Sequence, residues 1–351
     1  MSLAGAITKL REYASDSAAI LRGESCGVLN VSFNEQSCNL NCRVCGFSAK
    51  EVRSTYGTAS AMDSETFEHL VAAVPNRSDF WFDISAIAET LQFDHLEEFI
   101  ARLKSRKPQV NTIISTNGTL LTPERCQALV SSGLDFVQFS LFAPDPEGYA
   151  FITQTKVPFE KVVNNLLMLS EARGESKKPG LEVFIYDTLD FRDRAVPFIQ
   201  KYRDKVDEIY FRKLYDTAGM TQHGLNPEQT PERYPCGMLW YSGAVRSTGD
   251  FLMCYPIQWK DRKHKIANVR THSLKEYWRS LEPYRIMHLE GRWSEIPACK
   301  ECDAWSMTPS VFSKRKDGSF HIPWQRRAAA KIVNGIKALF RTKPFVRMHR
   351  S

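Results

Sequence analysis

The sequence has no apolar run long enough to cross a membrane. A spanning helix needs about 20 consecutive apolar residues, and this chain of 351 residues is 43% hydrophobic without such a run. Residues 1–21 also lack the succession of charged, apolar and small residues that marks a secretory signal peptide. We therefore expect a cytoplasmic protein whose nine cysteines are thiols rather than a disulfide framework.

Phosphate-binding loops are missing as well. Neither Gly-x-Gly-x-x-Gly nor Gly-x4-Gly-Lys-Ser/Thr follows any expected strand, so a nucleotide-phosphate site is not expected. The sequence contains no internal repeat and no low-complexity run, and its charged fraction is an ordinary 25%. This composition excludes a disordered or collagen-like chain.

The net charge of +7 is concentrated at the end of the chain. Residues 303–351 hold eleven Lys and Arg against two Asp, so residues 1–302 carry a net charge of −2. A nearly neutral body argues against a nucleic-acid partner. An amphipathic helix is expected at 324–341. It would contact either an anionic surface at the inner face of a membrane or an acidic partner, or else it would pack on the protein body.

Strands and helices are expected to alternate between residues 28 and 211. The expected strands are 28–33, 80–84, 112–114, 136–139, 181–186 and 208–211, and the helices between them are 63–74, 94–103, 122–131, 159–172 and 195–202. This α/β order predicts parallel strands with right-handed crossovers. Six strands are too few for a closed eight-stranded barrel, and a doubly wound sheet also fits the order.

Four segments differ in composition. A helical extension at 1–26 precedes the alternating region at 27–220, and a basic tail at 306–351 ends the chain. Residues 221–305 are rich in Pro, Gly, Trp and Cys, with only one good helix expected, at 273–281. A segment with so little periodic core usually needs a metal to hold it.

Three cysteines follow the first expected strand directly. Cys38, Cys42 and Cys45 have the spacing Cys-x3-Cys-x2-Cys, with no fourth cysteine nearby. Zinc sites normally bring four ligands, whereas three thiolates on a four-iron cluster leave one iron open to a ligand from outside the protein. The alternative is a chance group of buried thiols.

This cysteine loop resembles that of the radical S-adenosylmethionine (SAM) superfamily. The resemblance implies a partial (β/α)6 barrel similar to a TIM barrel and a 4Fe–4S cluster on Cys38, Cys42 and Cys45. It also implies that SAM chelates the open iron and is cleaved to a 5′-deoxyadenosyl radical. An external electron donor such as flavodoxin or ferredoxin would supply the electron.

Further residues resemble the family's SAM contacts. The family's second strand ends in a Gly-Gly-Glu-like motif, here Ala-Ile-Ala-Glu, so the resemblance implies that Glu89 holds the amino group of SAM. Asn117, in Thr-Asn-Gly after the third strand, and Ser140, after the fourth, match polar positions of the family.

Two further SAM contacts of the family have weaker matches in this sequence. Lys156 would meet the SAM carboxylate, unless it is a solvated surface lysine. Val44 precedes the third cysteine, where the family commonly has an aromatic residue, so Phe47 is the candidate for packing on adenine.

A second cysteine group lies in the last third of the chain. Cys236, Cys254, Cys299 and Cys302 alone could form a structural zinc site. Beside the first group they resemble the SPASM or shorter twitch extension of radical SAM enzymes, as found in aminocyclitol dehydrogenases and aminoglycoside epimerases. This resemblance implies one auxiliary 4Fe–4S cluster with every iron bound by protein, which acts as electron acceptor, structural staple or both.

An accepting cluster would make the reaction an oxidation of a small hydroxylated substrate of sugar or aminocyclitol type. A base is then needed near the end of the sixth strand, where Arg212 and Lys213 lie, although an arginine there is more often an ion-pair or substrate-carboxylate partner. An epimerase would instead need a thiol donor, for which Cys26 and Cys126 are left over.

Two other functions stay open on the sequence. One is a maturase that modifies a ribosomally synthesised peptide, although only about 26 residues precede the first strand, too few for a leader-binding domain. The other is a non-catalytic, metal-stapled binding protein.

Overall fold

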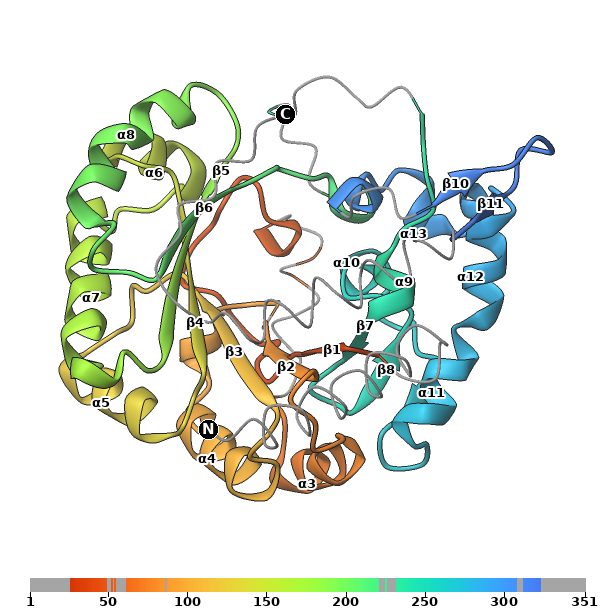
Figure 1. Ribbon diagram of the computed structural model, residues 1–351, viewed down its shortest axis with the longest axis horizontal. Coiled ribbons are helices and arrows are strands. Elements are labelled where there is room, and N and C mark those ends of the chain that lie inside the picture. The colour runs from red at the N-terminus through yellow and green to blue at the C-terminus, as the bar shows by residue number, and fades with distance from the viewer. Residues whose placement is uncertain are drawn as a thin grey trace, which may run out of the picture.

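The computed structural model describes residues 26–322 apart from 49–51, 53, 55–60, 86, 221–224, 226–231 and 308–311 (Figure 1). The helical extension expected at 1–26, apart from Cys26, and the helix expected at 324–341 therefore lie outside the described residues, as does the proposed tail contact. Within the described part, no helix combines the length and apolar character needed to span a membrane.

Six parallel strands form the centre of the molecule. In chain order they are β1 (Val28–Val31), β2 (Trp81–Ile84), β3 (Asn111–Thr116), β4 (Phe136–Phe142), β5 (Gly180–Tyr186) and β6 (Glu208–Arg212). Each pairs in parallel with the next one along the chain. A doubly wound sheet would reverse its strand order at the middle. The unbroken order therefore excludes it and confirms the partial barrel.

Helices cover the outer face of this curved sheet (Figure 1). They are α3 (Ser64–Ala73), α4 (Leu96–Arg106), α5 (Pro123–Ser131), α6 (Pro146–Thr153), α7 (Phe159–Ala172) and α8 (Phe191–Tyr202). Asp63, Thr122 and Asp145 cap the first residues of α3, α5 and α6 with their side chains. Helix α6 was not expected from the sequence.

The alternation of side chains along each strand defines an inside and an outside. In β4 the apolar Val137, Phe139 and Leu141 are fully buried, whereas Gln138 and Ser140 face the interior of the barrel and line a cavity. Successive side chains of a strand point to opposite faces. The outward residues therefore form the core beneath the helices, and the inward residues form a site.

The C-terminal region extends the same sheet. Strand β7 (Ser242–Val245) pairs in parallel with β1, opposite β2, and β8 (Asp250–Leu252) and β9 (Ala267–Asn268) follow in antiparallel order. Short helices flank these strands: α9 (Met238–Tyr241), α10 (Ile257–Lys260), α11 (Leu274–Ser280), α12 (Glu282–Leu289) and α13 (Pro297–Lys300). A separate hairpin joins β10 (Ser313–Lys314) to β11 (Phe320–His321). The cysteine-rich region is thus hydrogen-bonded to the edge of the barrel.

The expectation of one good helix in this region was wrong. Helix α11 lies where predicted, with Ser273 and Glu276 forming a capping box. Helix α12 follows it directly, but its buried face carries Arg285 and His288. Buried polar residues give no apolar periodicity, so the hydrophobic pattern did not reveal this helix.

Candidate active site

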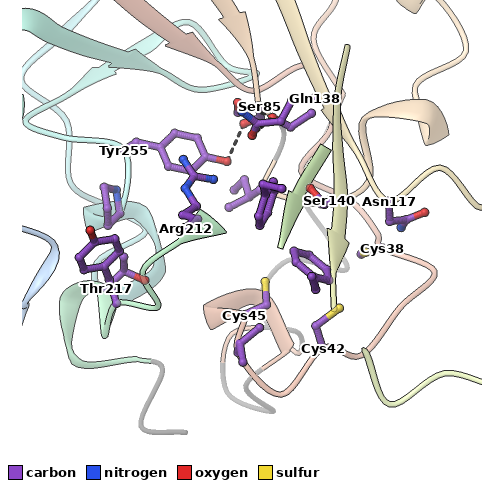
Figure 2. A pocket seen from close by; sticks show the side chains of 18 of the residues that line it. Cys38, Cys42, Cys45, Ser85, Asn117, Gln138, Ser140, Arg212, Thr217 and Tyr255 are labelled. Atoms are coloured by element: carbon purple, nitrogen blue, oxygen red, sulfur yellow. Dashed lines mark hydrogen bonds between the residues drawn. The ribbon is translucent and has the colours of Figure 1, made fainter. Parts of the chain in front are cut away.

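The first cysteine loop lies at the mouth of the barrel. Cys38, Cys42 and Cys45 line a cavity of about 350 Å³ (Figure 2). Side chains that point inward from the strands line the rest of it. The loop turns through a hydrogen bond of 3.1 Å from the Cys45 amide to the Cys42 carbonyl. Gly46 is required there, because a Cβ atom on it would lie 2.9 Å from the Trp259 ring.

The arrangement of these thiols fits a cluster. Among the described residues, no three His, Cys, Asp or Glu side chains are placed to hold a single metal ion. The three cysteines instead border open space, and thiolates are the ligands that iron–sulfur clusters take. The donor set and the cavity therefore fit a four-iron cluster with one iron left for another ligand.

Glu89 lies on the cavity wall beside the cysteines, only 4% exposed. Its carboxylate accepts hydrogen bonds from the Thr116 hydroxyl (2.5 Å), the Asn117 amide (2.9 Å) and the Leu91 amide (3.0 Å). Burial raises its pKa, and these donors oppose the shift. The carboxylate is therefore held in one orientation at the cavity, as a contact to an ammonium group requires.

The Thr-Asn-Gly turn is tied to the cysteine loop. Asn117 donates from its side-chain amide to Asn39, at 3.0 Å, and Asn39 donates to Thr119 at 2.6 Å. Gly118 has a φ of +71°, and a Cβ atom on it would lie 2.2 Å from the Phe139 ring. The structure thus brings Glu89, Asn117 and Ser140 to one cavity with the three cysteines.

Two of the predicted SAM contacts are not among the described residues that line the cavity. Lys156 is exposed between α6 and α7 and is not among the described residues that line the cavity. Phe47 is buried against Val52 and Ile87, with Cys38, Cys45 and Trp259 packed around them, and it too is absent from the described lining. Val44 lines the cavity instead.

A row of polar side chains runs across the inner face of the same strands. The Asp83 carboxylate accepts from the Ser85 hydroxyl, which lies 3.4 Å from that of Ser115. Ser115 donates to Gln138 at 3.2 Å, and Gln138 donates to the Tyr210 hydroxyl at 2.6 Å. This row was not predicted from the sequence, although the alternation of polar with apolar residues in strands β2 to β4 is the signal that reveals it.

Two carboxyl groups beside this row have raised pKa values. Burial raises the pKa of Asp83 to about 6, against the opposing effects of Ser85 and Arg212. Burial, together with the nearby Glu208 carboxylate, raises the pKa of Glu182 to about 7. Asp83 lines the cavity, whereas Glu182 is not among the described lining residues. A raised carboxyl pKa in a cavity is typical of a group that exchanges protons.

Arg212 and Lys213 line the cavity at the end of β6, as predicted. The Arg212 guanidinium lies over the Phe184 ring, 5.0 Å from its centroid. The Tyr255 hydroxyl donates a 2.5 Å hydrogen bond to the Ser85 carbonyl on the same side of the cavity (Figure 2).

The second cysteine group surrounds its own small cavity of about 30 Å³. Cys236, Cys254, Cys299 and Cys302 all line it, and burial raises the pKa of each thiol, to about 12 for Cys236 and Cys299. Four partly buried thiols with raised pKa values become thiolates at neutral pH when bound cations supply compensating charge. This donor set therefore also fits a metal cluster.

The two cavities share part of their walls. Met238 and Pro256 line both, and each follows a cysteine of the second group, Cys236 or Cys254, by two residues. A single layer of side chains therefore separates the four-cysteine site from the barrel cavity.

The two remaining cysteines lie in the protein core. Cys26 and Cys126 are fully buried, burial raises their pKa values to about 12 and about 11, and both lie outside the described lining of the cavity. The thiol donor that an epimerase needs is therefore not provided by either residue in this arrangement.

Two family models match the chain. One, described as the radical SAM superfamily, matches residues 36–185, and the other, described as the SPASM iron–sulfur cluster-binding domain, matches residues 236–303. A probable GTP 3′,8-cyclase of Methanocella arvoryzae is 39% identical over 69 residues. The match spans 20% of this chain and 22% of that relative.

Several solved structures share the fold. BtrN in complex with AdoMet and 2-DOIA has a TM-score of 0.55 and 18% identity, covering 79% of this chain and 93% of that one. SuiB of Streptococcus suis bound to precursor peptide SuiA has a TM-score of 0.59 and 14% identity, and the match covers 84% of this chain and 74% of SuiB. Native anSMEcpe with bound AdoMet has a TM-score of 0.56 and 12% identity, and the match covers 89% of this chain and 97% of anSMEcpe. At these identities the likeness concerns the fold.

Proposed function

The chain belongs to the radical SAM superfamily and carries a SPASM domain, and on that premise we propose that it oxidises a small hydroxylated substrate of sugar or aminocyclitol type. The observation that carries this proposal is the wall shared by the two cavities. Met238 and Pro256 separate the substrate space from the four-cysteine site by one layer of side chains. An electron that leaves the substrate therefore has an acceptor close by.

The family's cofactors are SAM and 4Fe–4S clusters. When bound, SAM and the cluster on Cys38, Cys42 and Cys45 supply the 5′-deoxyadenosyl radical that takes a hydrogen atom from the substrate. We assign Glu89 to the SAM amino group, because its fixed carboxylate lies beside the cysteines. Asn117 and Ser140 complete that side of the cavity.

The row of polar side chains from Asp83 to Gln138 would hold the substrate. Asp83, with a pKa of about 6, is ionised at neutral pH and basic enough to take a hydroxyl proton. The sequence had pointed to Arg212 or Lys213 as base, but a guanidinium does not give up its proton in proteins. Arg212 is better suited to hold the substrate oxygen while negative charge develops on that oxygen. The Lys213 ammonium would help to stabilise the same charge.

The proposed reaction is a two-electron oxidation of the substrate. A secondary alcohol loses one hydrogen atom to the 5′-deoxyadenosyl group, one proton to Asp83 and one electron to the four-cysteine site, and becomes a ketone. Glu89 and the three cysteines would hold SAM and its cluster, which would supply the hydrogen-accepting 5′-deoxyadenosyl group and release methionine at the expense of one electron from an external donor, for which flavodoxin and ferredoxin are the candidates. Oxidation is favoured over epimerisation because the spare thiols Cys26 and Cys126 lie outside the cavity lining that the structure describes.

The test uses anaerobically reconstituted protein with dithionite, SAM and a panel of sugars and aminocyclitols deuterated at their carbinol carbons. The proposal predicts 5′-deoxyadenosine that carries one deuterium and a ketone product. Cys42→Ala is the control that removes the reaction. Absence of deuterium transfer across the panel would contradict the substrate class.

A peptide maturase is the second candidate, because the SuiB structure that shares this fold holds a precursor peptide. A cavity of about 350 Å³ is in the range for a small molecule, and it would also admit one side chain of a peptide. Short peptides added to the same panel separate the two. If no member of either panel supports 5′-deoxyadenosine formation, a non-catalytic binding protein becomes the better interpretation.

A further inference from the structure

His288 lines the four-cysteine site, and one of its ring nitrogens has no hydrogen-bond partner among the described residues. The residue lies on α12, is fully buried and lines the small cavity with the four cysteines. Its Nδ1 atom accepts a 3.2 Å hydrogen bond from the Cys236 amide. Nδ1 can accept only when it carries no proton, so the proton of the neutral ring is on Nε2. Among the described residues, this buried Nε2–H group has no hydrogen-bond partner.

Arg233 brings a positive charge to the same cavity. Its guanidinium donates to the carbonyls of Cys299 (2.5 Å) and Lys300 (3.2 Å) and lies over the Trp293 ring, 5.1 Å from the centroid. These contacts fix the group against the segment that carries two of the cysteines. Its Nε–H is buried and, within the part of the chain that the structure describes, has no acceptor.

The Nε2–H group of His288 and the Nε–H group of Arg233 are two buried donors beside four thiols, and neither has an acceptor among the described residues. A buried N–H group without a partner destabilises the fold, and the sulfur atoms of a bound cluster are acceptors of the required kind. Hydrogen bonds and net charge around a cluster set its reduction potential. Each donor stabilises the reduced state, which is more negative by one charge, more than the oxidised state.

We propose that His288 and Arg233 raise the reduction potential of the cluster bound by Cys236, Cys254, Cys299 and Cys302, so that it accepts the electron released from the substrate. This inference rests on the proposed function, because it deepens the role of the four-cysteine site as acceptor. Both are positioning residues that act through the cluster, and neither is among the described residues that line the barrel cavity.

The test is a redox titration of the full-length chain with Cys38, Cys42 and Cys45 replaced by Ala, which isolates the second site. The electron paramagnetic resonance signal of the reduced cluster is followed after anaerobic reconstitution. His288→Asn keeps an acceptor for the Cys236 amide but removes the Nε2 donor. His288→Gln, the matched control, places an amide donor where Nε2 lies. Arg233→Gln and Arg233→Lys test the charge in the same way.

We expect His288→Asn and Arg233→Gln each to shift the reduction equilibrium about tenfold toward the oxidised state, which is ~59 mV for one electron. His288→Gln and Arg233→Lys should stay near the parent. If His288→Asn and Arg233→Gln titrate with the parent while iron content is unchanged, the inference is wrong and the proposed function is untouched. Zinc instead of iron in the parent would overturn both the inference and the accepting role of the site.

Discussion

The Tyr255 hydroxyl donates a 2.5 Å hydrogen bond to the backbone carbonyl of Ser85. Tyr255 follows Cys254 of the second cysteine group directly, and Ser85 follows strand β2 of the barrel. This one bond therefore joins the two metal-binding regions across the cavity between them. Both residues line that cavity, so the bond also defines part of the substrate wall.

Removing this hydroxyl is expected to weaken the junction. Tyr255→Phe leaves the Ser85 carbonyl without this donor, so the free energy of unfolding should fall by about 0.5–1.5 kcal/mol. Urea unfolding of the reconstituted protein measures it. Tyr202→Phe, on the outer helix α8, is the control, since its ring keeps its contact with Phe198. Equal stability of the two variants would show that the bond does not hold the regions together.

Glu89→Gln is expected to weaken SAM binding. An amide in place of the carboxylate loses the charge that an ammonium group would meet, and its NH2 group cannot accept from the three donors now present. Hydrogen bonds to charged groups contribute about 1.5–3 kcal/mol, so the dissociation constant for SAM should rise about tenfold or more. Calorimetry on reconstituted protein measures this. Glu160→Gln, exposed on α7, should bind SAM normally.

Two glycines with positive φ make a matched pair. Gly118 (φ +71°) has the Phe139 ring 2.2 Å from the position of a Cβ atom, whereas Gly174 (φ +55°) has nothing within 4 Å. Both alanine variants meet the left-handed penalty of about 1–2 kcal/mol, but only Gly118→Ala adds a steric clash. We expect Gly118→Ala to be destabilised by several kcal/mol more by overpacking. Similar melting temperatures for the two variants would contradict the close packing of this turn.

Asp83 should make stability depend on pH. Because its pKa in the folded protein, about 6, lies above the ordinary 3.8, the folded state holds its proton more tightly than the unfolded state. The stabilisation is complete below pH 3.8 and is lost as the pH rises through 6. Asp83→Asn should therefore be more stable than the parent at pH 8, by on the order of 1 kcal/mol because the cavity admits water, and equal to it at pH 3. Parallel melting curves across this range would refute the shift.

The same group should limit the reaction in acid. If Asp83 accepts the substrate proton, substrate-dependent formation of 5′-deoxyadenosine and ketone should decline below about pH 6, where the carboxylate becomes protonated. Asp83→Asn should form ketone at least about a hundredfold more slowly. A variant that retains both the parent rate and the parent pH profile would move the proton-accepting role to another residue.

The sequence predicted the parts of the site that local pattern controls. The spacing of Cys38, Cys42 and Cys45 after a short apolar strand placed the first cluster, and the alternation of apolar strands and amphipathic helices placed the barrel. These signals are local, because a loop length and a hydrophobic period are properties of neighbouring residues.

Other features depend on contacts between distant segments. The pairing of Val28 with Ser242 joins residues far apart in the chain and has no local signature. His288 gave no signal because it is a polar residue on a buried face, where its partner is the amide of Cys236, 52 positions away. Lys156 was proposed only as a stand-in for the basic residue that meets the SAM carboxylate, and the structure shows that this position is exposed.

The measurement that tests the account most directly is the anaerobic content of iron, sulfide and zinc per chain, in the parent and in Cys236→Ala/Cys254→Ala. The account predicts about eight irons in the parent and about four in the variant, since each four-iron cluster has its own cysteine group. About four irons and one zinc in the parent would contradict it, because a zinc site cannot accept the substrate's electron.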